Sequence, residues 1–206
     1  MKVLAINGSP HPQGTTSIAL QGMCDQLLQQ DIETEIVQVG QQAIRGCIGC
    51  SHCSKPGVHG CVFADDPVNA CFEKMRGADG LIIASPVYYG GIAGTMKCFL
   101  DRFFHSGAPT RFKIGAAFTC VRRTGGIEAY HQLNNYLTLG QMVIVPTQYW
   151  NVVHGNGQDV LQDGEGIQIL KNLAVNMAWL LRSLEEGGKQ VSLPTPGPRV
   201  RTDFIH

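Results

Sequence analysis

The chain has 206 residues, 44% of them hydrophobic, and a formal charge of zero from 16 basic and 16 acidic side chains. That length suits one α/β domain with a sizeable core, and the balanced charge excludes the basic excess of a nucleic-acid-binding surface. The sequence shows neither an apolar stretch of membrane-spanning length nor a basic-then-apolar leader. We therefore expect a single cytoplasmic domain over 1–206, with no nucleic-acid or membrane partner. In that compartment the eight cysteines are expected to be ligands, redox groups or core residues rather than disulfides.

The first predicted strand, 2–6, leads into a Gly- and hydroxyl-rich loop, and a helical pattern follows over 18–30. In a strand–loop–helix unit, the free N–H groups at the helix start bind anions. The loop contains neither G-x-x-x-x-G-K-S/T nor G-x-G-x-x-G, which argues against ATP or GTP chemistry and a Rossmann pyrophosphate site. Its neutral composition favours the single phosphate of FMN, and the alternative is a plain turn. The residues expected at the phosphate are Ser9, His11, Gly14, Thr15, Thr16 and Ser17.

A cysteine-rich insertion follows the second predicted strand, 32–39. Residues 40–66 show no clear period, and connections of this length are usually functional or disordered. They contain the spacing C-x₂-C-x₂-C-x₇-C, formed by Cys47, Cys50, Cys53 and Cys61. Four thiols this close favour a thiolate site, and ferredoxin clusters use a similar run. A [4Fe–4S] cluster, a zinc ion, and free or oxidised thiols are the three interpretations. The other cysteines, Cys24, Cys71, Cys98 and Cys120, are expected to be packing residues.

Strands and helices alternate through the rest of the chain. Further strands are predicted at 80–85, 113–118 and 141–145, and helices at 66–76, 94–105, 127–137 and 164–186, before an extended tail at 187–206. The alternation predicts a flavodoxin-like three-layer α/β sandwich with a five-stranded parallel sheet in the order 2-1-3-4-5. The loops after strands one, three and four should then meet at one end of the sheet, at a flavin site. The second loop contributes Pro86, Val87, Tyr88, Tyr89, Gly90 and Gly91, and the third contributes Thr119, Arg122, Gly125 and Gly126.

Several motifs resemble the NADPH-dependent FMN reductase and iron–sulfur flavoprotein group. They are Asn7-Gly-Ser-Pro…Gly14-Thr-Thr-Ser17, Ser85-Pro-Val-Tyr-Tyr-Gly-Gly91, Met96-Lys-Cys-Phe-Leu-Asp-Arg102, Tyr149-Trp-Asn151 and Arg201-Thr-Asp-Phe-Ile205. The resemblance covers nearly the whole chain and implies bound FMN in homodimers or homotetramers, with flavins near subunit interfaces. Carried over, the first loop holds the phosphate, 86–91 runs along the ring system and ribityl chain, and 119–126 closes the other side. The four spaced cysteines resemble the compact cysteine motif of iron–sulfur flavoproteins.

Two functions remain open from the sequence. In the first, NAD(P)H reduces bound FMN, which reduces a quinone, a free flavin or another small acceptor, and no catalytic side chain is required. In the second, the protein is an electron carrier between FMN, a [4Fe–4S] cluster and a partner such as ferredoxin. The zero formal charge weighs against the carrier, because small carriers usually dock through a patch of one sign. The tail, with Phe204 and Ile205 near its end, is expected to pack on the body or on a neighbouring subunit.

Overall fold

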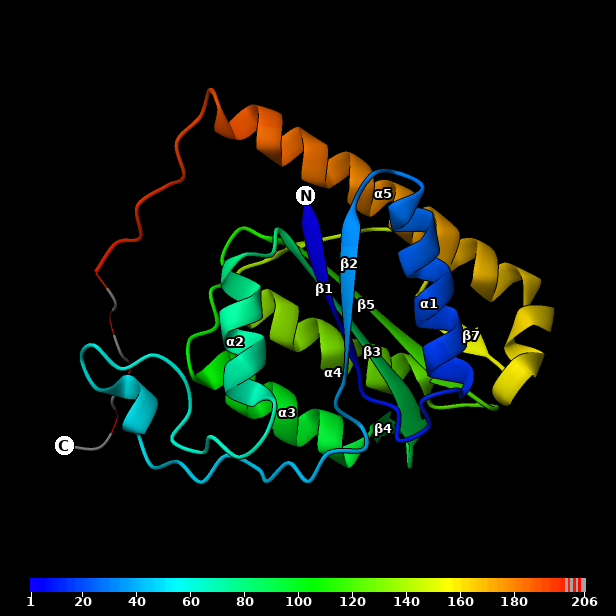
Figure 1. The fold of residues 1–206 in the computed structure, drawn as a ribbon, viewed down its shortest axis with the longest axis horizontal. Helices are drawn as coiled ribbons and strands as arrows, with labels where there is room; N and C mark the ends of the chain where they lie inside the picture. The colour runs from blue at the N-terminus through cyan, green and yellow to red at the C-terminus, as the bar shows by residue number, and fades with distance from the viewer. Residues whose placement is uncertain (199, 201, 203, 205–206) are drawn as a thin grey trace.

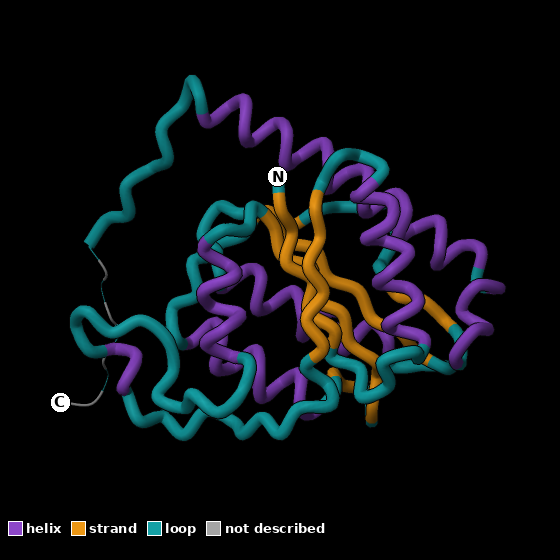
Figure 2. Tube along the Cα trace, viewed as in Figure 1, coloured by secondary structure: helices purple, strands orange, loops and turns teal. Residues whose placement is uncertain are grey.

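A twisted parallel sheet forms the centre of the molecule in the computed structural model, which describes residues 1–198, 200, 202 and 204 (Figures 1 and 2). Its main path runs β2-β1-β3-β5-β6. These strands are β1 (Lys2–Asn7), β2 (Glu33–Gln38), β3 (Gly80–Tyr88), β5 (Ile114–Val121) and β6 (Val143–Ile144). Numbered along the chain, these are the five predicted strands, and the predicted order 2-1-3-4-5 is confirmed.

Over the described residues the sheet has seven strands rather than the predicted five, and the two additional strands are short. β4 (Gly91–Ile92) pairs antiparallel with the end of β3 through a two-residue turn, in which Tyr89 and Gly90 have φ values of 51° and 73°. β7 (Val152–His154) pairs with the second half of β5, whereas β6 pairs with the first half. One edge of β5 is thus covered by two short strands, of which only β6 falls within the predicted fifth strand, 141–145.

Helices cover both faces of the sheet (Figure 2). One face packs against α1 (Thr15–Leu28) and α5 (Gly164–Gly188), and the other packs against α2 (Val68–Arg76), α3 (Gly94–His105) and α4 (Gly126–Leu139). β1 has apolar side chains for both layers: Val3 and Ala5 pack on the side of α1 and α5, and Leu4 and Ile6 pack on the side of α2, α3 and α4. A strand buried on both faces is apolar without alternation, which is how the sequence of β3 reads.

Two segments outside this sandwich were predicted as irregular. The insertion 40–66, all of which the structure describes, contains one 3₁₀ turn, η1 (His52–Ser54), and no other helix or strand; a second turn, η2 (Gly157–Gln162), precedes α5. Beyond α5 the described tail is extended, with Val191 and Phe204 exposed by 71% and 89% and one hydrogen bond from Arg111 to the Pro194 carbonyl. The described tail therefore stays exposed and contacts the body of its own chain at few points. Ile205, named with Phe204 above, lies outside the described residues.

None of the helices that the structure describes is both long enough and apolar enough to cross a membrane.

Candidate functional site

A cavity of about 430 Å³ opens at the ends of β1, β3, β5 and β7. All three predicted loops contribute to it, together with a fourth segment after β7. Its lining comprises Ser9, His11, Gly14, Thr15, Thr16, Pro86, Val87, Tyr88, Cys120, Arg122, Gly155, Asn156 and Gly157. These described lining residues include an arginine and no carboxylate, so the cavity suits an anionic group.

The first loop presents the start of α1 to this cavity. Thr15 is the first helical residue, and Gly14 before it provides no side-chain cap in the described structure. The amide of Ile18 is the first to bond back, to the Gly14 carbonyl at 3.0 Å. The earlier N–H groups therefore have no partner within the helix and are placed to bind an anion. The loop itself is held by the Ser9 amide donating to Asn7 Oδ1 at 2.9 Å.

Ser17 and Thr119, both predicted at the site, shape its loops from behind. Ser17 Oγ accepts a hydrogen bond from Asn7 Nδ2 at 2.8 Å and donates to the His11 carbonyl at 3.0 Å. Thr119 is buried, and its hydroxyl donates to the Gly126 carbonyl at 3.1 Å. Neither residue lines the cavity, so their hydroxyls support the backbone that does.

The hairpin turn and the third loop form a wall beside the cavity. Tyr88 is part of the lining, whereas Tyr89 is fully exposed at the turn with Gly90, and Gly91 lies in β4. A Cβ atom at Gly125, which has φ +85°, would lie 3.1 Å from Gly90 Cα. The third loop therefore approaches the turn closely because Gly125 carries no side chain.

The segment 155–157 was missed from the sequence. The Gly157 amide donates to Thr15 Oγ1 at 2.8 Å, which ties this segment to the first loop. Gly155 has φ +150°, and a Cβ there would lie 2.7 Å from Val160 Cα, so the position requires glycine. The available signal was the Gly-Asn-Gly run that follows two apolar residues, Val152 and Val153, of the unpredicted strand β7.

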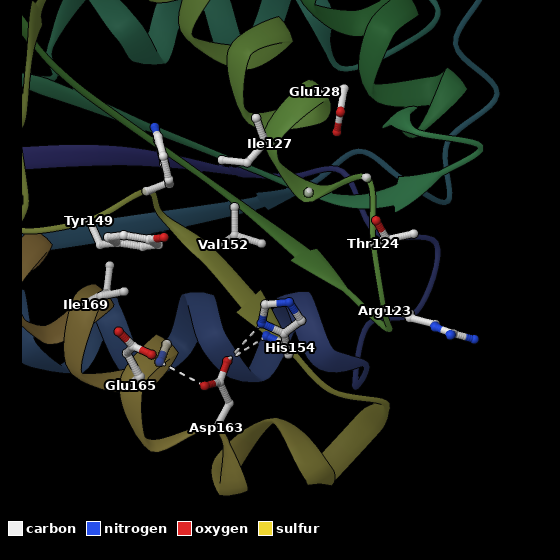
Figure 3. Close-up of a pocket in the computed structure, with 14 residues that line it drawn as sticks. Arg123, Thr124, Ile127, Glu128, Tyr149, Val152, His154, Asp163, Glu165 and Ile169 are labelled. Carbon is white, nitrogen blue, oxygen red and sulfur yellow. Dashed lines mark hydrogen bonds and ion pairs between the residues drawn. The ribbon is translucent and has the colours of Figure 1, made fainter.

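A second cavity, of about 370 Å³, lies between α4, β7 and α5 (Figure 3). Asp163 caps α5 by accepting from the Gly166 amide at 3.0 Å, and its other oxygen accepts from the His154 amide at 2.7 Å. Tyr149 and apolar side chains form its walls, and Gly125 and Gly126 belong to this cavity rather than to the first. Its carboxylates, Glu128, Asp163 and Glu165, outnumber the single arginine, Arg123. A phosphate is therefore better placed in the first cavity.

The four spaced cysteines line a third cavity, between the insertion and α3. Burial raises the pKa of the Cys53 thiol, and the nearby Cys61, Cys47 and Cys50 sulfurs raise it further. Cys53 Sγ donates to the His105 carbonyl at 3.7 Å. Within the described residues, no group of three or more His, Cys, Asp or Glu side chains is arranged to hold a metal ion. The sulfurs thus surround a common space without converging on one point.

The remaining cysteines differ from these four. Cys24, Cys71 and Cys120 are buried, and burial raises their pKa values to about 11, 12 and 12. They are neutral thiols near pH 7, including Cys120 in the wall of the first cavity. Cys98 is half-buried on α3, one helical turn before Arg102.

The strand order, the two helical layers and the cavity at the strand ends define a flavodoxin-like α/β protein. Residues 1–157 match the family model of the NADPH-dependent FMN reductases, and the chain belongs to this family. The family is that of FMN-dependent oxidoreductases.

Relatives agree with this assignment, and solved structures share the fold. An iron-sulfur flavoprotein of Methanocaldococcus jannaschii is 32% identical over 197 residues, covering 90% of this chain and 100% of the relative. A second iron-sulfur flavoprotein from that organism is 29% identical over 186 residues, covering 83% of this chain and 92% of the relative. The chain superposes on RosB, solved with 8-demethyl-8-formylriboflavin-5'-phosphate, with a TM-score of 0.69, 16% identity and coverage of 100% and 94%. The chain superposes on a flavodoxin from the domain Archaea with a TM-score of 0.60 and 14% identity, covering 88% of this chain and 99% of the flavodoxin. These structural likenesses show the fold.

Proposed function

We propose that this oxidoreductase holds FMN in the strand-end cavity and a [4Fe–4S] cluster at the four spaced cysteines, and that it transfers electrons through both. The arrangement of the four cysteines around one cavity is the observation that carries the proposal. The names of the two Methanocaldococcus relatives support it.

The first cavity fits the phosphate and one edge of FMN. The first-turn N–H groups of α1, the Thr15 hydroxyl and the Arg122 guanidinium would hold the phosphate, since each donates hydrogen bonds to anions. Tyr88 and Val87, which line the cavity, would lie along the ring system. Tyr89 is exposed and outside the lining, so its role would be packing rather than flavin contact. Bound FMN supplies hydride and single-electron chemistry, and the protein positions the reacting molecules over it.

We infer a cluster rather than a zinc ion at the cysteine cavity. Zinc requires all four sulfurs at about 2.3 Å from one point, and the described cysteines do not converge in that way. A cluster binds each thiolate at a different iron atom, so its ligands surround a larger space. Cys47, Cys50, Cys53 and Cys61 would hold it, and it would supply single electrons.

The electron donor has two candidates. The family description favours NADPH, with NADH as the alternative, and a small acceptor such as a quinone or a free flavin. The four-cysteine cavity favours a donor of single electrons, such as a reduced ferredoxin. Stopped-flow mixing with NADPH, NADH and reduced ferredoxin separates them, since the true donor bleaches the flavin at a useful rate.

Anaerobic reconstitution tests the cluster. We expect about four iron and four sulfide per chain, and a Cys53→Ala variant that loses the iron and keeps FMN. Cys98→Ala is the matched control, because Cys98 is a partly exposed thiol outside the cavity lining and should leave the iron content unchanged. Iron-free wild-type protein with full reductase activity would contradict the cluster and leave a simple FMN reductase.

A further inference from the structure

Arg102 on α3 is a fully buried cation beside the cysteine cavity. Its side chain is 0% exposed, and its partner Asp66 is 4% exposed. The guanidinium also donates to the Arg45 carbonyl at 3.3 Å and the Phe63 carbonyl at 3.2 Å. These partners belong to residues 45–66, so one side chain of α3 holds the insertion that carries the four cysteines.

The Nε–H donor is directed at the sulfur of Cys61 at 3.2 Å. A neutral thiol is a weak acceptor, and a buried N–H that lacks a good acceptor is costly. A thiolate sulfur, as in a metal-bound cysteine, accepts a much stronger, charge-assisted bond.

The guanidinium therefore distinguishes Cys61 from the other three cysteines. Cys53 Sγ instead donates to a backbone carbonyl, a bond that a ligating thiolate cannot make. Hence Cys61 is the cysteine whose surroundings are already arranged for a negatively charged sulfur.

We propose that Arg102 is a positioning residue of the cluster, whose Nε–H donates to the ligating sulfur of Cys61 and raises the reduction potential of the cluster. This inference rests on the proposed function. Reduction adds negative charge that spreads onto the ligand sulfurs, so a hydrogen-bond donor at one sulfur stabilises the reduced state more than the oxidised state.

The test compares reconstituted holoprotein of the wild type with Arg102→Met/Asp66→Asn. Removing both members of the ion pair leaves no unpaired buried charge and does not change the net charge. A change in potential then reports the lost N–H···S bond. Arg102→Lys is the second variant, because it keeps the charge but not the planar fork. Arg45→Met is the control, since Arg45 is exposed and stacks on the same Phe63 ring, at 4.5 Å, that Arg102 approaches.

Iron content, FMN content and an EPR-monitored redox titration are the readouts. At a fixed poise we expect the ratio of reduced to oxidised cluster to fall about tenfold in the double variant, which is about 59 mV for one electron. This ratio should also fall in Arg102→Lys, and in Arg45→Met it should equal that of the wild type. If the double variant keeps FMN but takes up no iron, the potential of the Arg102→Lys cluster decides: a lowered potential supports the inference, and a wild-type potential overturns it.

Wild-type potentials and spectra in both Arg102 variants, with four iron bound, would overturn this inference and leave the cluster intact. A wild type that takes up no iron would instead refute the proposed function itself.

Discussion

At the scale of single residues, Thr15 connects the two segments that form the anion site. Its Oγ1 accepts from the Gly157 amide at 2.8 Å, which leaves its hydroxyl hydrogen free to donate. The same residue opens α1 and lines the cavity. One hydroxyl therefore both fixes the segment 155–157 and offers a donor to a bound phosphate.

We predict that Thr15→Ala weakens FMN binding roughly ten- to a hundredfold, because a hydrogen bond to a charged group contributes about 1.5–3 kcal/mol. Thr15→Ser is the matched control, since it keeps the hydroxyl and should bind within a few-fold of the wild type. Titration of apoprotein with FMN, followed by quenching of flavin fluorescence, measures both. Equal affinities in the alanine and serine variants would mean that the loop is only a turn.

At the scale of elements, the split edge of the sheet is held together by Asn151. Between β6 and β7 the chain leaves the edge of β5, and Asn151 fills the gap. Its Nδ2 donates to the Ala117 carbonyl at 2.9 Å, its Oδ1 accepts from Thr147 Oγ1 at 2.7 Å, and its own carbonyl accepts from the Thr119 amide at 3.0 Å. A side chain thus takes the place of a strand residue and directs β7 towards the cavity.

We predict that Asn151→Ala lowers the free energy of unfolding by about 1–3 kcal/mol, because the buried Ala117 carbonyl loses its partner. Asn172→Ala on α5 is the control. Its amide also bonds a side chain, Gln148 at 3.1 Å, but at an exposed site, so the change should stay within about 0.5 kcal/mol. Urea unfolding of the two variants compares them, and equal stability would show that the gap closes without the amide.

At the scale of the whole molecule, apolar side chains remain uncovered in a single chain. Trp179 on α5 and Tyr89 at the hairpin turn are exposed, as are Leu193 and Phe204 on the tail. Prolines stiffen the tail and lower the entropy lost when it docks. Since the described tail contacts its own chain at few points, a neighbouring subunit is the surface that it would cover.

We predict a homodimer or homotetramer in solution, and a smaller assembly after deletion of residues 189–206. Light scattering coupled to size-exclusion chromatography measures both. Trp179→Glu, which leaves the tail intact, shows whether α5 contributes a separate contact. A full-length monomer, or an assembly that keeps the same number of subunits after the deletion, would refute the role of the tail.

The sequence by itself determined the layers and the strand order. Apolar periods of strand and helix are local properties, and parallel strands joined by helices have few permitted arrangements. The hydroxyl-rich first loop and the cysteine spacing are also local patterns. Residues close together in the chain therefore pointed to the strand-end cavity and to the cysteine cavity.

The tertiary structure alone decided which side chains serve those cavities. Arg102 and Cys61 are 41 positions apart, and Thr15 and Gly157 are 142 positions apart. Ser17 was predicted at the phosphate, but its hydroxyl hydrogen-bonds Asn7 and His11 and does not line the first cavity. Such contacts depend on how whole elements pack, and packing between distant segments leaves no periodic signal in the sequence.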